Sequence, residues 1–394
     1  MQDLLFLAHR IPYPPNKGDK IRSYHLLKYL SLNYKVHLGT FIDDSNDWQY
    51  TDKLKALCAS TCYIELKPVL AKIKSVQGLL TGEPLSLPYY KNKRMQAWVN
   101  QTLSSYSITK VLIFSSAMAQ YINQDHEVDM VVDFVDVDSD KWRQYAQRCK
   151  GLKHWIYKRE AQYLLGYEKI IAEQARASIF VSEQEVELFK TLAPEVSHKV
   201  THINNGVDCE YFLPESSFST PYAKDDQIII FTGAMDYWAN VDAVVWFAKF
   251  IFPLISEQLP SVKFYIVGSK PTKEVLALDK DSIIVTGVVD DIRPYLAYAQ
   301  IVVAPLRIAR GIQNKVLEAM AMEKYVVATT AAMEGIVNQQ DLAVTIADNI
   351  NHMSAEIIRQ LQKNIPAHQN RDFVLAQFSW DHSAKKLISL LQNQ

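Results

Sequence analysis

The chain has 394 residues, which at roughly 100–200 residues per domain predicts two or three domains. Hydrophobic residues make up 48% and charged residues 22%, the composition of an ordinary folded protein, which excludes a mainly disordered chain. The formal net charge of −1 excludes the overall basicity typical of nucleic-acid-binding proteins. The spacing of the 4 cysteines predicts no zinc site and is typical of reduced thiols in the cytoplasm.

The N-terminal segment Met1–Ala8 lacks a basic region, and its apolar run is too short for a signal peptide. The sequence has no stretch of about 18 apolar residues, so no membrane-spanning helix is expected. We therefore expect a cytoplasmic protein that lies at most on the inner surface of the cytoplasmic membrane.

Short apolar runs alternate with helical patterns along the first half of the chain, as expected of a doubly wound parallel sheet buried on both faces. The predicted strands are Leu4–Ala8, Lys35–Phe41, Cys62–Leu66, Lys110–Phe114, Met130–Phe134 and Ala177–Val181. The predicted helices between them are Ile21–Asn33, Trp48–Cys58, Lys93–Ser105 and the long Lys141–Ala175.

The second half repeats this alternation and predicts a second sheet of the same class. Its predicted strands are Gln227–Thr232, Val262–Val267, Ser282–Thr286, Ile301–Ala304, Tyr325–Thr329 and Ala343–Ile346. Its predicted helices are Asn240–Gln258, Lys273–Asp279, Val289–Ala299, Asn314–Met322, Ala355–Asn364 and Ser379–Gln392.

Between the halves, Asn204–Asp208 and Phe212–Pro214 lead into a polar stretch that ends at Asp226. The cluster of Gly, Asn, Pro and Ser residues predicts a linker over residues 209–225, between a first domain ending at residue 208 and a second beginning at residue 226. Two doubly wound domains around one hinge create a cleft between the carboxyl ends of their sheets, where such sheets bind ligands.

The loop after the first strand contains three prolines and then Gly18, just before a predicted helix. A glycine at a helix start offers free N–H groups and a positive dipole end to an anion. Lys17 and Arg22 add positive charge nearby, so we interpret this loop as a candidate phosphate or acceptor site. A plain strand-to-helix turn explains the same glycine.

Two loops of the second half follow predicted strands in the same way. Gly233 leads towards Asn240, a plausible helix cap, and Val288 follows Gly287 at the end of another strand. The Gly233 loop is a candidate phosphate contact, and a turn that needs glycine for close packing explains it equally well. The backbone of the Gly287 loop is expected to face the cleft, and the alternative is that Asp290 caps the next helix.

The segment 305–320 combines a glycine at a helix start with three cations, Arg307, Arg310 and Lys315. Glu318 lies on the same predicted helix, surrounded by apolar residues, where a carboxylate is costly unless it accepts hydrogen bonds. The two hydroxyls of a ribose would supply such donors. A structural ion pair with Lys315 or an arginine is the alternative.

Four acidic residues cluster where a strand ends and a long helix begins, among them Asp136 and Asp138. Some of the residues here are expected to cap the helix. The D-x-D spacing also fits a metal site, while crowded carboxylates beside a cleft fit proton transfer or substrate binding.

In this order, the segments resemble the retaining glycosyltransferases of the GT-B fold, glycosyltransferase family 4, also called glycosyl transferases group 1. The resemblance covers essentially the whole chain. It is carried by Gly311–Met322 with the following strand Tyr325–Thr329, by the linker Asn204–Asp208, and by Phe378–Trp380 before the last helix. Within the family, Phe231–Ala243 is most similar to bacterial exopolysaccharide-associated sugar transferases.

This resemblance implies an α/β protein with two Rossmann-like domains facing a cleft. The first, residues 1–208, would bind the acceptor, and the second, residues 226–376, would bind the nucleotide-sugar. Residues 377–394 would form a C-terminal helix that packs back on the first domain. The implied reaction moves a sugar from a nucleotide-diphosphate donor, a UDP-sugar, to a bacterial surface glycan or lipid-linked acceptor, with retention at the anomeric carbon.

The resemblance also implies roles for the candidate residues. Glu318 would bind the ribose, and the loop containing Val288 would contact the base. The donor sugar and diphosphate would be held by Gly311, Ile312, Asn314 and Lys315. The Gly18 loop would close over phosphate and acceptor, and Asp136 and Asp138 would lie near the reacting sugar. Neither a metal nor a cofactor is expected.

Arg310 departs from the family pattern, because the family places an acid eight residues before Glu318 and this position holds Arg310. The loop 233–240 also lacks the basic residues common in the family, so Arg307, Arg310 and Lys315 are expected to bind the diphosphate. Two other functions stay open: a GT-B-fold nucleotide-sugar epimerase, and a non-catalytic nucleotide-sugar-binding subunit, which Arg310 in place of the acid suggests. The absence of G-x-G-x-x-G after either first strand argues against a nicotinamide dehydrogenase.

Two basic and apolar segments, residues 67–80 and 141–169, are candidates for contact with an anionic membrane surface. The second is explained equally well as a helix packed on the sheet. No nucleic-acid partner is expected.

Overall fold

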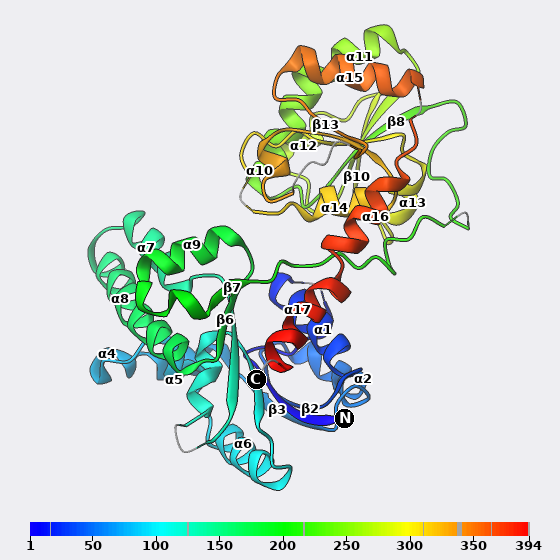
Figure 1. Ribbon diagram of the computed structural model, residues 1–394. Helices are drawn as coiled ribbons and strands as arrows, with labels where there is room; N and C mark the ends of the chain where they lie inside the picture. The colour runs from blue at the N-terminus through cyan, green and yellow to red at the C-terminus, as the bar shows by residue number, and fades with distance from the viewer. Residues whose placement is uncertain are drawn as a thin grey trace. The chain divides into compact units, whose positions relative to one another are not determined.

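The computed structural model describes residues 1–15, 17–123, 126–215, 217–309, 311–336, 341–363 and 365–392, apart from the side chain of Leu80. The chain forms two compact units (Figure 1). The N-terminal unit comprises Met1–Asn205 and Ser383–Gln394, and the C-terminal unit comprises Gly206–His382. Each unit is a parallel sheet covered by helices, which confirms the predicted pair of doubly wound domains.

The sheet of the N-terminal unit has the strand order β3-β2-β1-β4-β5-β6-β7. Its strands are β1 (Gln2–Ala8), β2 (Tyr34–Ile42), β3 (Ser60–Glu65), β4 (Lys110–Phe114), β5 (Asp129–Val135), β6 (Ala177–Phe180) and β7 (Val200–His202). Its helices are α1 (Gly18–Leu30), η1 (Ser45–Tyr50), α2 (Thr51–Lys55), α3 (Pro68–Ser75), α4 (Gly78–Thr81), α5 (Ser86–Tyr90), α6 (Lys93–Ser105), η2 (Ser116–Tyr121), α7 (Asp138–Gln147), α8 (Gly151–Gln174), α9 (Glu183–Leu192) and η3 (Pro194–Lys199).

The central strand β1 is buried on both faces, as its continuous apolar sequence predicts. Leu5 and Leu7 pack into one hydrophobic cluster, and Leu4 and Phe6 pack into another. The last helix, α17 (Trp380–Gln392), contributes Leu387 to the second cluster.

The predicted long helix over residues 141–175 is wrong, because the structure divides it into α7 and α8. Gly151, the first residue of α8, has a φ of 66°, a conformation that favours glycine and interrupts a continuous helix. The two helices instead pack against each other, with the Trp142 and Tyr157 rings 5.2 Å apart.

The sheet of the C-terminal unit has the order β10-β9-β8-β11-β12-β13. Its strands are β8 (Gln227–Thr232), β9 (Val262–Val267), β10 (Ile283–Gly287), β11 (Ile301–Ala304), β12 (Tyr325–Ala328) and β13 (Val344–Ile346). Its helices are α10 (Trp238–Trp246), the π-helical η4 (Phe247–Ile251), α11 (Phe252–Gln258), α12 (Lys273–Leu276), α13 (Arg293–Tyr298), α14 (Asn314–Ala321), η5 (Ala331–Met333), α15 (Ile350–Lys363) and α16 (His368–Gln377).

The helical run Trp238–Gln258 is long and apolar enough to cross a membrane by length and composition alone, although the sequence led us to expect no such helix. Half of its apolar window is buried, and Phe247, Ile251 and Ile255 belong to the core of the C-terminal unit. The π-helical turn η4 ends two residues before Pro253, which cannot donate a backbone hydrogen bond. These contacts are those of a core helix.

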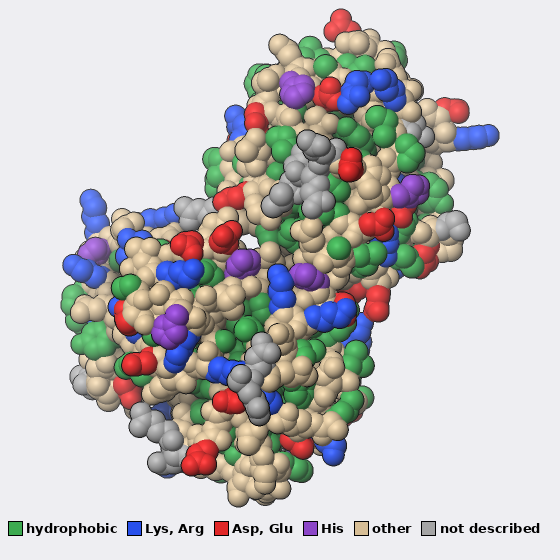
Figure 2. Space-filling model, in the orientation of Figure 1, with side chains coloured by type: hydrophobic (Ala, Val, Ile, Leu, Met, Phe, Trp, Pro, Cys, Tyr) green, Lys and Arg blue, Asp and Glu red, His purple; other side chains and the backbone are tan. Residues whose placement is uncertain are grey.

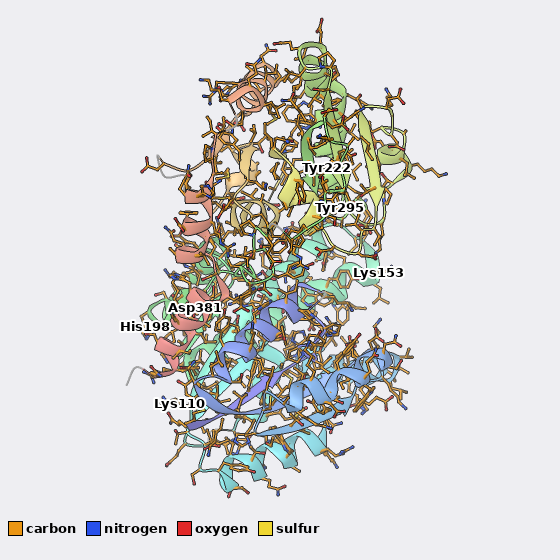
Figure 3. The ribbon with its side chains drawn as sticks, turned by 90° about the vertical axis from the view of Figure 1, so that its right-hand side faces the viewer. Lys110, Lys153, His198, Tyr222, Tyr295 and Asp381 are labelled. Carbon is orange, nitrogen blue, oxygen red and sulfur yellow. The ribbon has the colours of Figure 1, made fainter. Side chains whose placement is uncertain are left out.

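Most of the segment predicted as a linker packs on the C-terminal unit. Tyr222 is buried, and its hydroxyl donates to the Tyr295 carbonyl at 2.7 Å; Figure 3 shows the two residues close together. Arg371 donates to the carbonyls of Cys209 and Phe212 at 3.0 and 2.7 Å. At the point where the units join, a Cβ on Gly206 would lie 2.4 Å from the Trp380 nitrogen, so only glycine fits there.

In both sheets the chain first builds strands to one side of its starting strand and then crosses to the other side. This reversal lies between β1 and β4 in the first sheet and between β8 and β11 in the second. Parallel α/β sheets bind ligands at the carboxyl ends of their strands beside such a reversal. The residues that follow β1, β4, β8 and β11 are therefore where each unit is expected to bind a ligand.

Candidate functional site

Three adjacent strands of the C-terminal unit end in glycine. Gly233 follows β8, Gly268 follows β9 and Gly287 ends β10, and all three have φ values in the region that favours glycine, 154°, 155° and 69°. A Cβ on Gly268 would lie 1.7 Å from the Gly233 carbonyl oxygen, so the two backbones meet without room for a side chain. The carboxyl edge of this sheet is therefore lined by backbone that a ligand can approach closely.

Lys315, in the first turn of α14, reaches this glycine edge. A Cβ on Gly233 would lie 3.0 Å from its Nζ, which therefore lies beside the end of β8. The ammonium donates to Asn240 Oδ1 at 2.5 Å and lies 4.3 Å from the centre of the Phe231 ring. Asn240 Nδ2 donates in turn to the Ala234 carbonyl at 2.9 Å, which orients the amide. Burial lowers the pKa of Lys315 to about 8, against the opposing effect of the Glu318 carboxylate.

Glu318 lies three residues further along α14, half-buried among core residues. Burial raises the pKa of its carboxyl to about 7, although the charge of Lys315 opposes this rise. No close ion pair between Lys315 and Glu318 is found among the described contacts: the Lys315 ammonium donates to Asn240, and the two groups interact only through their charges. Within the described part of the chain, no hydrogen bond or ion pair to the Glu318 carboxylate is found.

The remaining predicted donor residues have different surroundings. Arg307 is held by Asp242, with its Nε donating to Oδ2 at 2.9 Å, so its charge is already balanced by a carboxylate. Gly311 has a φ of 65° and open space where a Cβ would be. Asn314, the first residue of α14, and Val288, in the loop after β10, are both exposed. Arg310 lies outside the described residues.

Ile312 has a packing role in addition to its predicted place in the site. A Cβ on Gly335 would lie 2.9 Å from Ile312 Cγ1, so the glycine accommodates the Ile312 side chain. Gly335 has a φ of 77°, which also favours glycine. The contact fixes the loop that leads into α14 and hence the first turn that carries Lys315.

In the N-terminal unit, Lys17 and Gly18 are exposed at the start of α1, but Arg22 is buried. Its Nε donates to Asp133 at 2.8 Å, and its Nη1 donates to the Ile203 carbonyl and to Asn205 Oδ1, whereas its buried Nη2 has no hydrogen-bond partner among the described residues. Burial raises the pKa of Asp133, and Arg22 opposes that rise. Arg22 thus binds a buried carboxylate and the end of the unit, and its role in anion binding stays a prediction.

A polar cluster that the sequence analysis did not select follows β1. Arg10 donates to Asp19 at 2.5 Å and to Asp43 at 3.0 Å, and the His9 ring stacks on Phe114 at the end of β4. Burial favours the neutral form of Asp19, but the His9 hydrogen bond and the Arg10 charge hold its pKa below the usual value. The sequence could have indicated this cluster, because His9 and Arg10 begin the same loop that contains the candidate residues Lys17 and Gly18.

Asp136 and Asp138 both contact one cation. Lys141 Nζ lies 2.7 Å from Asp136 Oδ2 and 3.1 Å from Asp138 Oδ1, and the two carboxylates hold the pKa of Lys141 above its usual value despite burial. Val135, just before them, has a φ of 69°, a strained conformation for a β-branched residue. Among the described residues, no group of three or more His, Cys, Asp or Glu side chains could hold a metal ion.

Residues 226–363 match the family described as glycosyl transferases group 1. The whole chain is similar to solved glycosyltransferase structures. A glycosyltransferase of Rickettsia africae is 15% identical with a TM-score of 0.62, covering 100% of this chain and 99% of the other. HepE of Anabaena, in complex with UDP, is 15% identical with a TM-score of 0.62 over 99% of each chain. TarM is 12% identical with a TM-score of 0.61, covering 100% of this chain and 99% of the other. No curated protein matches in sequence.

The chain has the GT-B fold. The residues that match the group 1 family lie in the C-terminal unit and include Gly233, Lys315 and Glu318. The structure thus brings together the glycine edge and the first turns of α14, which the sequence placed in separate segments. It also adds Asn240 and Gly268 to this group, one as the partner of Lys315 and the other as the partner of Gly233.

Proposed function

We propose that this protein is a retaining glycosyltransferase that uses a nucleotide-diphosphate sugar, with a UDP-sugar as donor. The observation that carries the proposal is the pair Lys315 and Glu318 on one helix beside the glycine edge of a group 1 domain. The acceptor is a hydroxyl of a bacterial surface glycan or of a lipid-linked glycan, and the reaction takes place in the cytoplasm or at the membrane surface.

Glu318 binds the ribose of the donor. Its carboxylate has several acceptor positions and no hydrogen-bond donor among the described residues, and the two ribose hydroxyls supply two donors. Hydrogen bonding to the ionised carboxylate favours that form, so donor binding lowers the raised pKa of Glu318. Val288, exposed after the end of β10, lies in the loop proposed to contact the base.

Lys315 binds the diphosphate. Its ammonium is already held beside Gly233 by Asn240, so the positive charge does not have to be reoriented when the anion arrives. Gly311, Ile312 and Asn314 form the turn around it and offer backbone and amide groups to phosphate and sugar. Arg307 contributes less than the sequence suggested, because Asp242 neutralises it.

In the transfer step, the acceptor oxygen bonds to the anomeric carbon on the face from which the diphosphate leaves. The bond between this carbon and the phosphate oxygen breaks, its electron pair stays on the diphosphate, and the acceptor proton passes to the departing oxygen. Lys315 stabilises the charge that develops there. No metal and no cofactor enters this scheme. Asp136, Asp138, Lys17 and Gly18 are the acceptor-side groups, together with the Arg10 cluster.

The UDP assignment is supported by complexes of structurally similar proteins. HepE of Anabaena has been crystallised with UDP and with UDP-glucose, and TarM of S. aureus with UDP. These proteins are 12–15% identical to this chain, so they support the donor class and leave the sugar to experiment.

Thermal unfolding in the presence of UDP, GDP, dTDP and ADP tests the donor site. A ligand present at about a hundred times its Kd stabilises the folded state by roughly 2.7 kcal/mol, which is readily measured. We expect UDP to give the largest shift and Glu318→Gln to abolish it. No shift with any nucleotide contradicts the proposal. Binding without turnover of any UDP-sugar and acceptor favours the non-catalytic binding subunit, to which the arginine at position 310 also points.

A further inference from the structure

Helix α3 of the N-terminal unit carries a row of exposed aliphatic side chains. Val69 is 72% exposed, Leu70 54%, Ile73 64%, and Val76, just beyond the helix, 55%. Val69, Ile73 and Val76 are spaced at i, i+4 and i+7, which places them on one face of a helix. Single exposed aliphatic residues need no explanation, but four on one short helix form a continuous apolar surface.

Lysines flank this row on both sides. With 3.6 residues per turn, Lys72 lies beside the row on one side and Lys74 on the other. Neither forms an ion pair within the described part of the chain, and residues 67–81 contain no acid. Just before this segment, the Glu65 carboxylate lies 3.8 Å from the Lys67 ammonium. The six residues Val69, Leu70, Lys72, Ile73, Lys74 and Val76 are called the α3 surface below.

A pocket with a net positive lining adjoins this helix. Its volume is about 170 Å³, and its lining includes Lys67, Lys74, Lys91 and the Tyr89 ring, with one acid, Glu65, which pairs with Lys67. Leu70 belongs both to the pocket lining and to the α3 surface. The pocket opens where β2 and β3 end, at the carboxyl edge of the sheet, which is the edge that binds ligands in this class of fold.

Helix α8 also exposes apolar side chains beside basic ones. Arg159 donates to the carbonyls of Gly78 and Glu83, so the middle of α8 lies against the segment that follows α3. The first turns of α8 expose Leu152 and Trp155 beside Lys153, a residue labelled in Figure 3. Figure 2 shows hydrophobic side chains beside Lys and Arg at the edge of the N-terminal unit near α8 and α4.

We propose that the α3 surface docks on an anionic lipid bilayer and that the pocket beneath it receives an anionic lipid head group. Aliphatic side chains enter the boundary of head groups and acyl chains, while flanking lysines bind the phosphates. The observation that selects lipid is charge complementarity: an apolar row bordered by lysines without acidic partners matches a surface that is apolar inside and anionic outside. This inference rests on the proposed function, because docking on the bilayer brings a lipid-linked acceptor to the carboxyl edge of the N-terminal sheet.

Co-sedimentation of the full chain with lipid vesicles tests this proposal. We expect binding to phosphatidylcholine vesicles that contain phosphatidylglycerol, weak binding to phosphatidylcholine alone, and loss of binding at high salt. Lys72→Glu with Lys74→Glu lowers the partition coefficient by roughly fivefold or more per lysine. Val69→Ser with Ile73→Ser and Val76→Ser lowers it by roughly tenfold or more, because the apolar row no longer inserts.

Matched controls lie on the other unit. Lys249→Glu with Lys280→Glu makes the same change of charge, and Phe250→Ser with Leu276→Ser removes two apolar side chains that are 54% and 51% exposed. These variants are expected to bind vesicles like the wild type, and all variants are expected to unfold at the wild-type temperature because every changed side chain is exposed.

Three results overturn the docking proposal: no binding to anionic vesicles, equal binding to neutral vesicles, or α3 variants that bind like the controls. A change in molecular mass on light scattering when the α3 surface is altered also overturns it, because the surface then joins two copies of the chain. Thermal shift with UDP separates this proposal from the donor site. If UDP binds and vesicles do not, only the docking proposal is overturned. If vesicles bind and no nucleotide does, only the proposed transferase function is overturned.

Discussion

Replacing Glu318 by Gln is predicted to stabilise the protein at high pH while removing donor binding. The carboxyl has its pKa raised by burial from 4.5 to about 7 in the folded chain. The folded state therefore binds this proton more tightly than the unfolded state, and the associated stability is present below about pH 4.5 and lost as the pH rises through about 7. The amide of Gln does not ionise and avoids this loss.

The size of both effects follows from the site. A pKa raised by this amount corresponds to roughly 3 kcal/mol at about 1.4 kcal/mol per pH unit, so Glu318→Gln gains up to that much stability at pH 8 and little at pH 5. In the donor complex, the variant loses two hydrogen bonds to a charged acceptor, each worth about 1.5–3 kcal/mol. Because Gln keeps one acceptor oxygen, we expect a loss of about 3 kcal/mol, which is more than a hundredfold in Kd.

Urea unfolding at pH 5 and pH 8 measures the stability, and titration calorimetry with a UDP-sugar measures the affinity. Glu274→Gln is the control, because Glu274 is an exposed acid on α12 of the same unit. It is expected to change neither quantity. If Glu318→Gln binds the UDP-sugar as tightly as the wild type, Glu318 is not the ribose ligand. If it is less stable than the wild type at pH 8, the carboxylate has a structural partner and the reasoning from burial is wrong.

Three further predictions follow from close contacts in the two units. Asn240→Ala removes the hydrogen-bond partner of the Lys315 ammonium. We expect kcat to fall roughly tenfold and the alkaline limb of its pH profile to move to lower pH. An unchanged profile would show that Asn240 does not position Lys315. Gly268→Ala places a Cβ 1.7 Å from a carbonyl oxygen and is expected to lower the free energy of unfolding, measured in urea, by about 3 kcal/mol or more. Gly18→Ala is the control: the added Cβ meets open space, and the loss should be less than about 1 kcal/mol. Arg22→Met leaves the Asp133 carboxylate buried without its cation and is expected to lower the free energy of unfolding by about 3–5 kcal/mol. UDP should still bind to this variant. Loss of UDP binding at wild-type stability would instead place Arg22 in the ligand site.

The two doubly wound sheets could be predicted because burial on both faces leaves a direct mark on the sequence. Leu4–Ala8 is apolar at every position, and the structure shows why: alternate side chains enter two different clusters. Glu318 could be selected for a related reason, because a carboxylate within an apolar helix face is costly and so calls for an explanation. Both inferences depend on residues that are neighbours in the sequence.

The parts that could not be predicted depend on contacts between distant residues. Asn240 and Lys315 are separated by 75 positions, and Arg10 and Asp43 by 33 positions, so no local pattern pairs them. Arg22 looked like a free cation because its partner, Asp133, lies 111 positions away. The division between α7 and α8 depends on the backbone conformation of Gly151, a glycine that a helical pattern tolerates and that we therefore did not treat as a break.

Lys315 and Glu318 together predict that donor binding changes the protonation of the protein in a direction that depends on pH. In the free chain, the pKa values are about 8 for Lys315 and about 7 for Glu318. The diphosphate favours the charged ammonium and raises the first pKa, and the ribose hydroxyls favour the charged carboxylate and lower the second. Binding should therefore release protons at pH 6.5, where Glu318 is largely protonated, and take up protons at pH 8, where Lys315 is about half deprotonated.

Titration calorimetry with a UDP-sugar in buffers of different ionisation enthalpy measures this exchange, since the bridging diphosphate does not titrate between pH 6 and 8. The net exchange should change sign between these pH values, where release from Glu318 balances uptake by Lys315. Lys315→Met should abolish the uptake at pH 8 and preserve the release at pH 6.5. Exchange of one sign across the whole range would mean that only one of the two groups contacts the donor. With these pKa values, each group is partly neutral when the site is empty, and binding of the donor provides the charge or hydrogen bonds that stabilise the charged form of each group.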